Sequence, residues 1–205
     1  TELEAARQLT MSAAAMKDQG ARYTRQASMA KLFASETATI VTDLAVQIHG
    51  GYGFCSEYPA ERYYRDERIN RIFEGTNEIN RMLVPGMIMR KALKGELPFL
   101  QAAQAVAEEL TGLPSFAEPG EPEFMEDEAK LVANMKKVVL ATLGLAAQTF
   151  GQGLKDQQEV FSDVADICME AYACESALLR TLKKKEAGGE EAARMMADMT
   201  TLYVH

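Results

Sequence analysis

The chain has 205 residues, of which 47% are hydrophobic and 25% are charged, and its formal net charge is −8. This length is enough for one or two domains with a buried core. The negative charge argues against an isolated nucleic-acid-binding domain, because such domains are usually basic. Three cysteines without a C-x-x-C spacing and only two histidines indicate reduced thiols and predict no metal site.

Periodic apolar residues predict a chain made of helices. The expected helices, in chain order, cover residues 2–18, 25–49, 60–69, 76–93, 99–110, 131–154, 160–183 and 190–203. In the second of these, one side of the helix carries a single charge, Glu36, among the apolar positions Met29, Leu32, Phe33, Ile40, Leu44 and Ile48. No segment alternates as a strand would, so the predicted fold class is all-α.

A proline-rich segment divides the chain. Residues 111–123 contain prolines at 114, 119 and 122 and are predicted to be a linker. The domain organisation expected from this is a helical bundle over 1–98, a helix and Pro/Glu-rich linker over 99–124, and a second helical domain over 125–205. Because the chain starts at Thr1 and enters a helix at once, we expect it to be a piece of a longer protein.

The segment Gln47-Ile-His-Gly-Gly-Tyr-Gly-Phe54 begins in the last turn of the second predicted helix and continues beyond it. Three glycines in four residues let another molecule approach the backbone closely, and exposed N–H groups suit phosphates. The same glycines are also consistent with a simple helix stop and turn. Glycine content alone does not decide between these two interpretations.

Glu74-Gly75-Thr76 follows the apolar pair Ile72 and Phe73. Thr76 is predicted to cap the helix that follows, and Gly75 leaves room for a ligand. Apolar neighbours would raise the pKa of the Glu74 carboxyl above its ordinary value and make it a better general base. The alternative is a surface glutamate ahead of a capped helix. A third segment, residues 61–68, is dense in charge and is predicted to form a salt-bridged helix face.

Taken together, the Gln-Ile-x-Gly-Gly-x-Gly-Phe and Glu-Gly-Thr blocks between residues 47 and 76 closely resemble the C-terminal helical domain of the acyl-CoA dehydrogenase family. The resemblance covers residues 1–95. Residues 100–205 resemble the extra helical region of the very-long-chain branch, and Phe73 also looks like that branch's form.

The resemblance implies an enzyme of fatty acid β-oxidation that converts a fatty acyl-CoA to the trans-2-enoyl-CoA with FAD, and that passes electrons to an electron-transfer flavoprotein. Glu74 would remove the α proton, and Gly75 would lie against the substrate. Two other branches of the family instead take this base from a distant helix. Gln47, Gly50 and Gly51 would touch FAD bound mainly by the neighbouring subunit, whereas Thr76 and Glu78 would touch FAD in their own subunit. This sharing implies a homodimer or a dimer of dimers.

The family's N-terminal helical domain and middle β-domain hold much of the cofactor, and neither corresponds to these residues. We therefore expect that this chain alone neither binds FAD tightly nor turns over substrate. A bacterial cytoplasm and a mitochondrial matrix, peripheral to the inner membrane, both fit the sequence. The competing hypothesis is a helical interaction or assembly module without catalysis, in which residues 125–205 dock a partner or, through Lys183-Lys184-Lys185, make a weak contact with a membrane surface.

Overall fold

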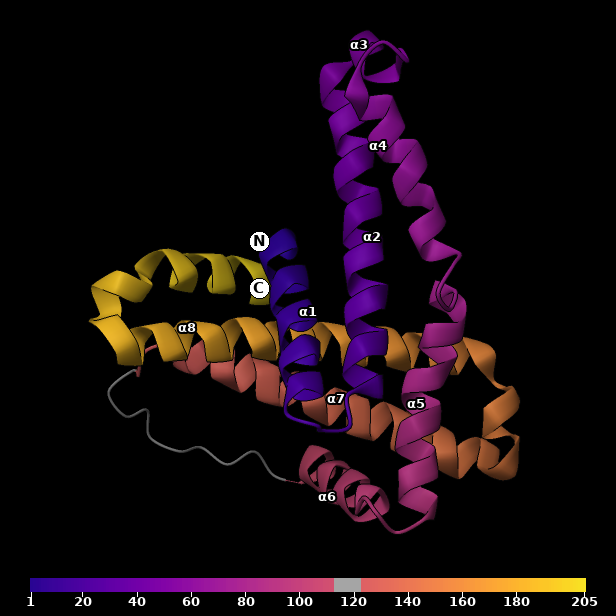
Figure 1. Cartoon of the computed structure of the whole chain (residues 1–205). Coiled ribbons are helices and arrows are strands. Elements are labelled where there is room, and N and C mark those ends of the chain that lie inside the picture. Colours follow the sequence, from indigo (N-terminus) through magenta and orange to yellow (C-terminus); the bar gives the residue numbers. More distant parts are fainter. Residues whose placement is uncertain (113–122) are drawn as a thin grey trace. The chain divides into compact units, whose positions relative to one another are not determined.

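The structure is a computed structural model that describes residues 1–112 and 123–205 (Figure 1). Helices and connecting turns make up these ranges, in which no strand occurs, so the predicted all-α fold is confirmed. Nearly all of the predicted linker, residues 113–122, lies outside the described residues. Within the described part, no helix is long and apolar enough to cross a membrane.

The chain divides into two compact units. One contains Glu2–Leu83, and the other contains Val84–His205 together with Thr1. The division falls inside helix α5 (Asn77–Leu93). The domain boundaries expected from the sequence stay a prediction.

The N-terminal unit is built on two helices, α1 (Glu2–Asp18) and α2 (Thr24–His49), which pack against each other. Both match the predicted ranges to within one residue. Their spacing of apolar residues at three and four positions gives each helix a buried side. The side chains that form this core are Ala5, Ala6, Leu9, Ala13, Met29, Leu32 and Phe33.

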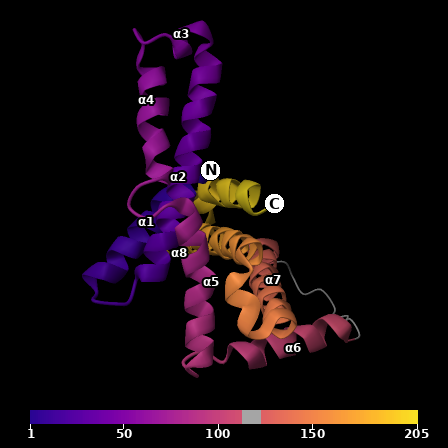
Figure 2. The ribbon, with the colours of Figure 1, turned by 90° about the vertical axis from the view of Figure 1, so that its right-hand side faces the viewer.

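The second half of α2 forms a hairpin with α4 (Pro59–Arg68), and the short helix α3 (Gly51–Phe54) lies at its tip (Figures 1 and 2). Pro59 lies in the first turn of α4, where a missing N–H costs nothing. A 3-10 turn, η1 (Ile69–Arg71), then leads toward α5. The Glu74 segment therefore lies at the opposite end of the hairpin from the glycines.

The expected apolar side of α2 is buried only in its first half. Ile40, Leu44 and Ile48 are 49%, 52% and 81% exposed. The side that faces α4 and the Glu74 segment is instead polar, and it includes Ser35 and Thr39. Periodicity located the helix correctly but did not identify the face that packs within this unit.

The C-terminal unit contains α6 (Phe99–Thr111), α7 (Glu126–Phe150), the 3-10 segment η2 (Gly151–Asp156) and α8 (Gln158–Val204). Helix α7 packs against both α6 and α8. A Cβ at Gly144 would lie 2.7 Å from the Cβ of Ala103, so a glycine is needed where α6 and α7 meet. Helix α7 begins five residues earlier than predicted, because three acids in its first turn favour a helix N-terminus.

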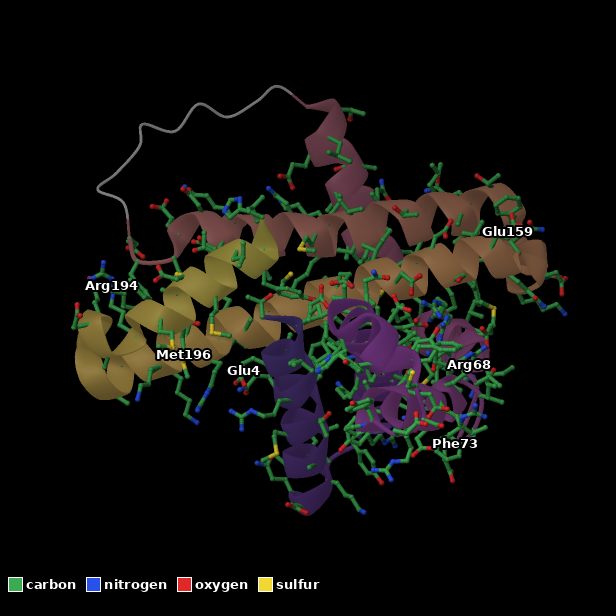
Figure 3. The ribbon with its side chains drawn as sticks, turned by 90° about the horizontal axis from the view of Figure 1, so that it is seen from above. Glu4, Arg68, Phe73, Glu159, Arg194 and Met196 are labelled. Atoms are coloured by element: carbon green, nitrogen blue, oxygen red, sulfur yellow. The ribbon has the colours of Figure 1, made fainter. Side chains whose placement is uncertain are left out.

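Helix α8 is two helices separated at Gly189, whose φ of 79° is left-handed. Gly189 lies with Gly188 in the gap between the helices predicted over 160–183 and 190–203. The second helix, which carries Arg194 and Met196, folds back along the first (Figure 3). The hydroxyls of Thr181 and Thr200 lie 2.8 Å apart across this fold and are both buried. An apolar cluster of Met125, Val132, Cys174 and Leu178 lies beneath it.

The Cys174 thiol in this cluster predicts a pH dependence of stability. Burial, followed by the negative charge of Glu170, raises the pKa of Cys174 from 9.0 to about 11. The folded state disfavours the thiolate, so this contribution to stability is complete below pH 9.0 and is lost as the pH rises through about 11. The expected loss in the free energy of unfolding is on the order of 2 kcal/mol.

Urea unfolding of the 205-residue chain on both sides of this pH window measures the effect. The Cys174→Ala variant should lose less stability than the unaltered chain on going to high pH. An equal loss in both proteins would contradict the prediction. Other groups that titrate in the same range are common to the two chains and cancel in the comparison.

Candidate active site

The Glu74 turn joins η1 to α5 and has an unusual backbone. Glu74 has a φ of 57° and Gly75 a φ of 85°, so two consecutive residues are left-handed. Glycine adopts this region freely, but an L-residue with a side chain pays roughly 1–2 kcal/mol. Backbone strain of this kind is concentrated at functional sites and persists only where surrounding contacts enforce it.

Thr76 caps α5, as predicted. The backbone N–H of Ile79 donates to the Thr76 hydroxyl over 3.2 Å, which is the contact expected of an N-cap threonine. Hydrogen bonds from its own backbone N–H and from Thr76, with the nearby Arg81 and Arg71, hold the pKa of the Glu78 carboxyl below its ordinary value. The start of α5 therefore stabilises negative charge.

The carbonyl oxygen of Gly75 is held by two side chains. It accepts a hydrogen bond from Lys31 Nζ at 2.8 Å and another from Asn80 Nδ2 at 2.9 Å. Lys31 comes from α2 and Asn80 from α5, so the turn is held from both helices. Asn80 also donates to the Thr76 carbonyl oxygen at 3.1 Å.

Asn77 is fully buried below the turn and connects it to α2. Its Nδ2 donates to Ser35 Oγ and to Glu36 Oε1, both at 2.9 Å, and its Oδ1 accepts from Lys31 Nζ at 2.7 Å. Glu36 in turn pairs with Arg71 and Arg81, each at 3.3 Å. None of these contacts was predicted from the sequence. The one available signal was Glu36, the single charge on an otherwise apolar side of the predicted helix.

Glu74 is exposed, and its apolar neighbours do not shield it. Ile72 is 52% exposed and Phe73 is 46% exposed, and Figure 3 shows Phe73 at the outer edge of its unit. The expectation that these two side chains dehydrate the carboxylate is therefore wrong for the described chain. Both side chains lie largely outside the buried core of this unit, and the turn is held instead by the polar contacts of Lys31, Asn77 and Asn80.

The glycine segment lies at the tip of the hairpin and is open. Gln47 is exposed, Gly50 has a φ of 58°, and a Cβ added at Gly50 or Gly51 would meet no atom within 4 Å. Along α2, the distance from Lys31 to Gln47 is roughly 24 Å, at about 1.5 Å per residue. The structure therefore brings Glu74, Gly75, Thr76 and Glu78 together and leaves Gln47, Gly50 and Gly51 as a separate group.

Substitution by alanine is expected to have very different effects on stability at Gly53 and at Gly51. A Cβ at Gly53 would lie 2.4 Å from the Val46 carbonyl oxygen, whereas one at Gly51 would be free of contacts within 4 Å. Gly53→Ala is expected to lower the free energy of unfolding by about 2 kcal/mol or more, because the helix end must shift. Gly51→Ala is expected to change it by less than about 0.5 kcal/mol.

Urea unfolding of the two variants side by side measures this difference. Equal changes in the free energy of unfolding would show that the Val46 carbonyl oxygen does not prevent a side chain at residue 53. Since Gly51→Ala is expected to leave the fold intact, any loss of FAD that it causes in the whole protein would report on the cofactor contact itself.

The charged segment 61–68 lies on α4, and only part of it forms the predicted salt-bridged face. Arg65 pairs with Glu61 at 3.1 Å on the exposed side. Glu67, however, is buried and accepts a hydrogen bond from Thr39 at 2.9 Å. Its Oε1 atom has no hydrogen-bond partner among the described residues.

Two family models match the chain, and both are described as the C-terminal domain of acyl-CoA dehydrogenases; the first covers residues 1–88 and the second residues 134–205. A probable acyl-CoA dehydrogenase of Bacillus subtilis (strain 168) is 50% identical over 184 residues, which is 90% of this chain and 31% of that protein. The mitochondrial short-chain specific acyl-CoA dehydrogenase of Rattus norvegicus is 52% identical over 88 residues, 43% of this chain and 21% of that protein.

Among solved structures, an acyl-CoA dehydrogenase complexed with FAD from Bacillus anthracis superposes with a TM-score of 0.81 at 47% identity. The match covers 89% of this chain and 30% of that one. The chain thus spans about a third or less of the length of these relatives. The roles assigned to single residues stay predictions, but the family resemblance is confirmed: this chain belongs to the acyl-CoA dehydrogenase family and has the helices of its C-terminal domains.

Proposed function

We propose that this chain is the C-terminal part of an FAD-dependent acyl-CoA dehydrogenase of fatty acid β-oxidation, and that Glu74 is its catalytic base. Glu74 would remove the α proton of a fatty acyl-CoA, Gly75 would lie against the thioester, and the product would be the trans-2-enoyl-CoA. Bound FAD supplies the acceptor for the hydride that leaves the β carbon. The relatives named above, 50% and 52% identical, support this assignment.

The observation that carries the proposal is the strained turn. Glu74, which is exposed, and Gly75 both have left-handed backbone conformations. Lys31 and Asn80 both donate hydrogen bonds to the Gly75 carbonyl oxygen. An α proton beside a thioester is weakly acidic, so its base must be held in a fixed orientation and kept from water. This unit supplies the orientation. Exclusion of water from Glu74 would come from the acyl chain and from parts of the protein beyond this chain.

The chain has two places that fit parts of FAD. The open backbone at Gly50 and Gly51, with the exposed amide of Gln47 beside it, would contact the cofactor held mainly by a neighbouring subunit. Thr76 and Glu78 at the start of α5 would contact the cofactor of their own subunit. This sharing of FAD between subunits would require a homodimer or a dimer of dimers. The two groups lie roughly 24 Å apart along α2.

The electron acceptor and the acyl group follow from the same proposal. A relative 47% identical over 91 residues is named as a subunit of a caffeyl-CoA reductase–Etf complex of Acetobacterium woodii, which supports an electron-transfer flavoprotein as partner. Phe73 and the helices after residue 100 favour a long acyl chain. The short-chain specific relative of Rattus norvegicus matches over 88 residues, 43% of this chain, and so does not account for the full length of the chain. The compartment would be a bacterial cytoplasm or a mitochondrial matrix.

The visible absorption spectrum of the whole protein tests this function. An oxidised flavin band should be present and should bleach when palmitoyl-CoA is added without oxygen, and more slowly with butyryl-CoA. A flavin band that responds to neither thioester would contradict dehydrogenation of a fatty acyl-CoA. The 205-residue chain purified by itself should retain no FAD, because it covers 30% of its FAD-bound structural relative.

The alternative, a module that docks on a membrane surface, has weaker support in the structure. Of the three lysines proposed for that contact, Lys185 already pairs with Glu190 at 2.8 Å and lies 4.5 Å from the Phe124 ring centre. Sedimentation with vesicles rich in anionic lipid at low salt would test it. Co-sedimentation that salt reverses would favour docking, and its absence would exclude the membrane contact.

A further inference from the structure

The Gly75 carbonyl oxygen accepts two hydrogen bonds from outside its own turn. One comes from Lys31 on α2, 44 residues earlier in the chain, and the other from Asn80 in α5. Two donors from different helices fix both the position and the direction of this oxygen. The peptide plane between Gly75 and Thr76 is therefore fixed, and Glu74 is the residue immediately before Gly75.

Lys31 is itself held in place. Its ammonium group also donates to Asn77 Oδ1 at 2.7 Å, and Asn77 is fully buried and bonded to Ser35 and Glu36. Partial burial lowers the pKa of Lys31, while the carboxylates of Glu78 and Glu36 act in the opposite direction. A lysine in this position is a directed donor rather than a freely moving surface charge.

The backbone of the turn requires such a restraint. With a φ of 57°, Glu74 occupies a region that a residue with a side chain rarely adopts, and Gly75 follows with 85°. If the Gly75 carbonyl were released, the turn would be free to return Glu74 to negative φ. That change would swing the carboxylate away from its present direction, since the side chain moves with the backbone.

We propose that Lys31 is a positioning residue for the base: by holding the Gly75 carbonyl together with Asn80, it keeps the Glu74 carboxylate in the orientation needed to remove the α proton. This inference rests on the proposed function. Lys31 acts through the turn and not on the substrate, so its effect belongs to the rate of the chemical step rather than to the binding of acyl-CoA.

The test compares three variants of the whole protein in anaerobic single-turnover reduction by palmitoyl-CoA. Lys31→Met keeps the length of the side chain but removes the donor, and it should lower the limiting rate of flavin reduction by about 100-fold, a loss typical of a misplaced catalytic group. The half-saturating concentration of acyl-CoA and the FAD content should stay unchanged. Lys31→Arg, which keeps a donor, should recover most of the rate. Lys17→Met, at an exposed lysine of α1, is the matched control and should behave as the unaltered protein.

A second measurement separates positioning from general damage to the fold. Amide hydrogen exchange of Ile79 and Asn80, whose backbone N–H groups donate to Thr76 at the start of α5, should become faster in Lys31→Met, while exchange in the core of α1 and α2 stays slow. Should Lys31→Met fail to fold, Asn80→Ser, which removes the other donor, is expected to show the same loss of rate with unchanged half-saturation.

Glu74→Gln in the same assay distinguishes the inference from the function on which it rests. If Glu74→Gln is inactive but Lys31→Met reduces flavin at the unaltered rate, the positioning role is wrong and the base stands. If Glu74→Gln is fully active, the base itself is wrong. A Lys31→Met variant that loses rate only through weaker acyl-CoA binding would also overturn the positioning role.

Discussion

Replacing Glu74 by glutamine is expected to lower the rate of flavin reduction by palmitoyl-CoA about 10³-fold or more, within the range that a general base contributes. Glutamine has the same shape and keeps the backbone donors and acceptors of the turn, but its amide cannot accept the α proton. FAD should therefore remain bound at the level of the unaltered protein. Anaerobic stopped-flow absorbance of the whole protein gives the rate, and the oxidised flavin band gives the cofactor content.

Glu61→Gln is the matched control for this substitution. Glu61 lies on α4, and its carboxylate pairs with Arg65 near the surface, so its loss should leave flavin reduction unchanged. A Glu74→Gln protein that reduces flavin as fast as Glu61→Gln would remove Glu74 as the base. In that case a base from a distant helix, as in two other branches of the family, would take its place.

Replacing Asn77 by leucine is expected to lower the free energy of unfolding by about 3 kcal/mol. Asn77 is fully buried and joins Lys31, Ser35 and Glu36. Leucine is similar in volume but offers no donor or acceptor, so the lysine and the carboxylate lose a partner where water has little access. Urea unfolding of the 205-residue chain measures the change.

Asn134→Leu, at an exposed position of α7, serves as the control and should change stability by less than about 0.5 kcal/mol. If the two substitutions cost the same, the Asn77 network does not stabilise the turn. In the whole protein, Asn77→Leu should also slow flavin reduction, because the anchor of Lys31 is lost.

The features that the sequence predicted well are local ones. Helix positions follow from apolar residues at spacings of three and four, and the break at Gly189 follows from a glycine pair. The cap at Thr76 follows from a threonine directly before a helix. These signals act within one or two turns of a helix, so the order of residues is sufficient to identify them.

The features that the sequence did not predict depend on contacts between distant residues. Lys31 meets Gly75, and Glu36 meets Asn77, across 44 and 41 positions of the chain. No periodicity relates such pairs. The exposure of Ile72 and Phe73 was missed for the same reason, since burial is decided by what covers a residue and not by its own hydrophobicity. The left-handed φ of Glu74 was not foreseen either, because only the neighbouring glycine signals it.

The most direct test of Glu74 as the base is the exchange of the substrate's α hydrogens with solvent. The whole protein would be incubated with palmitoyl-CoA in D₂O without an electron acceptor, and deuterium in the recovered acyl-CoA would be measured by mass spectrometry. A carboxylate that takes the α proton reversibly exchanges it with solvent. The unaltered protein and Glu61→Gln should therefore incorporate deuterium, and Glu74→Gln should not. Equal incorporation by Glu74→Gln would show that another group removes the proton.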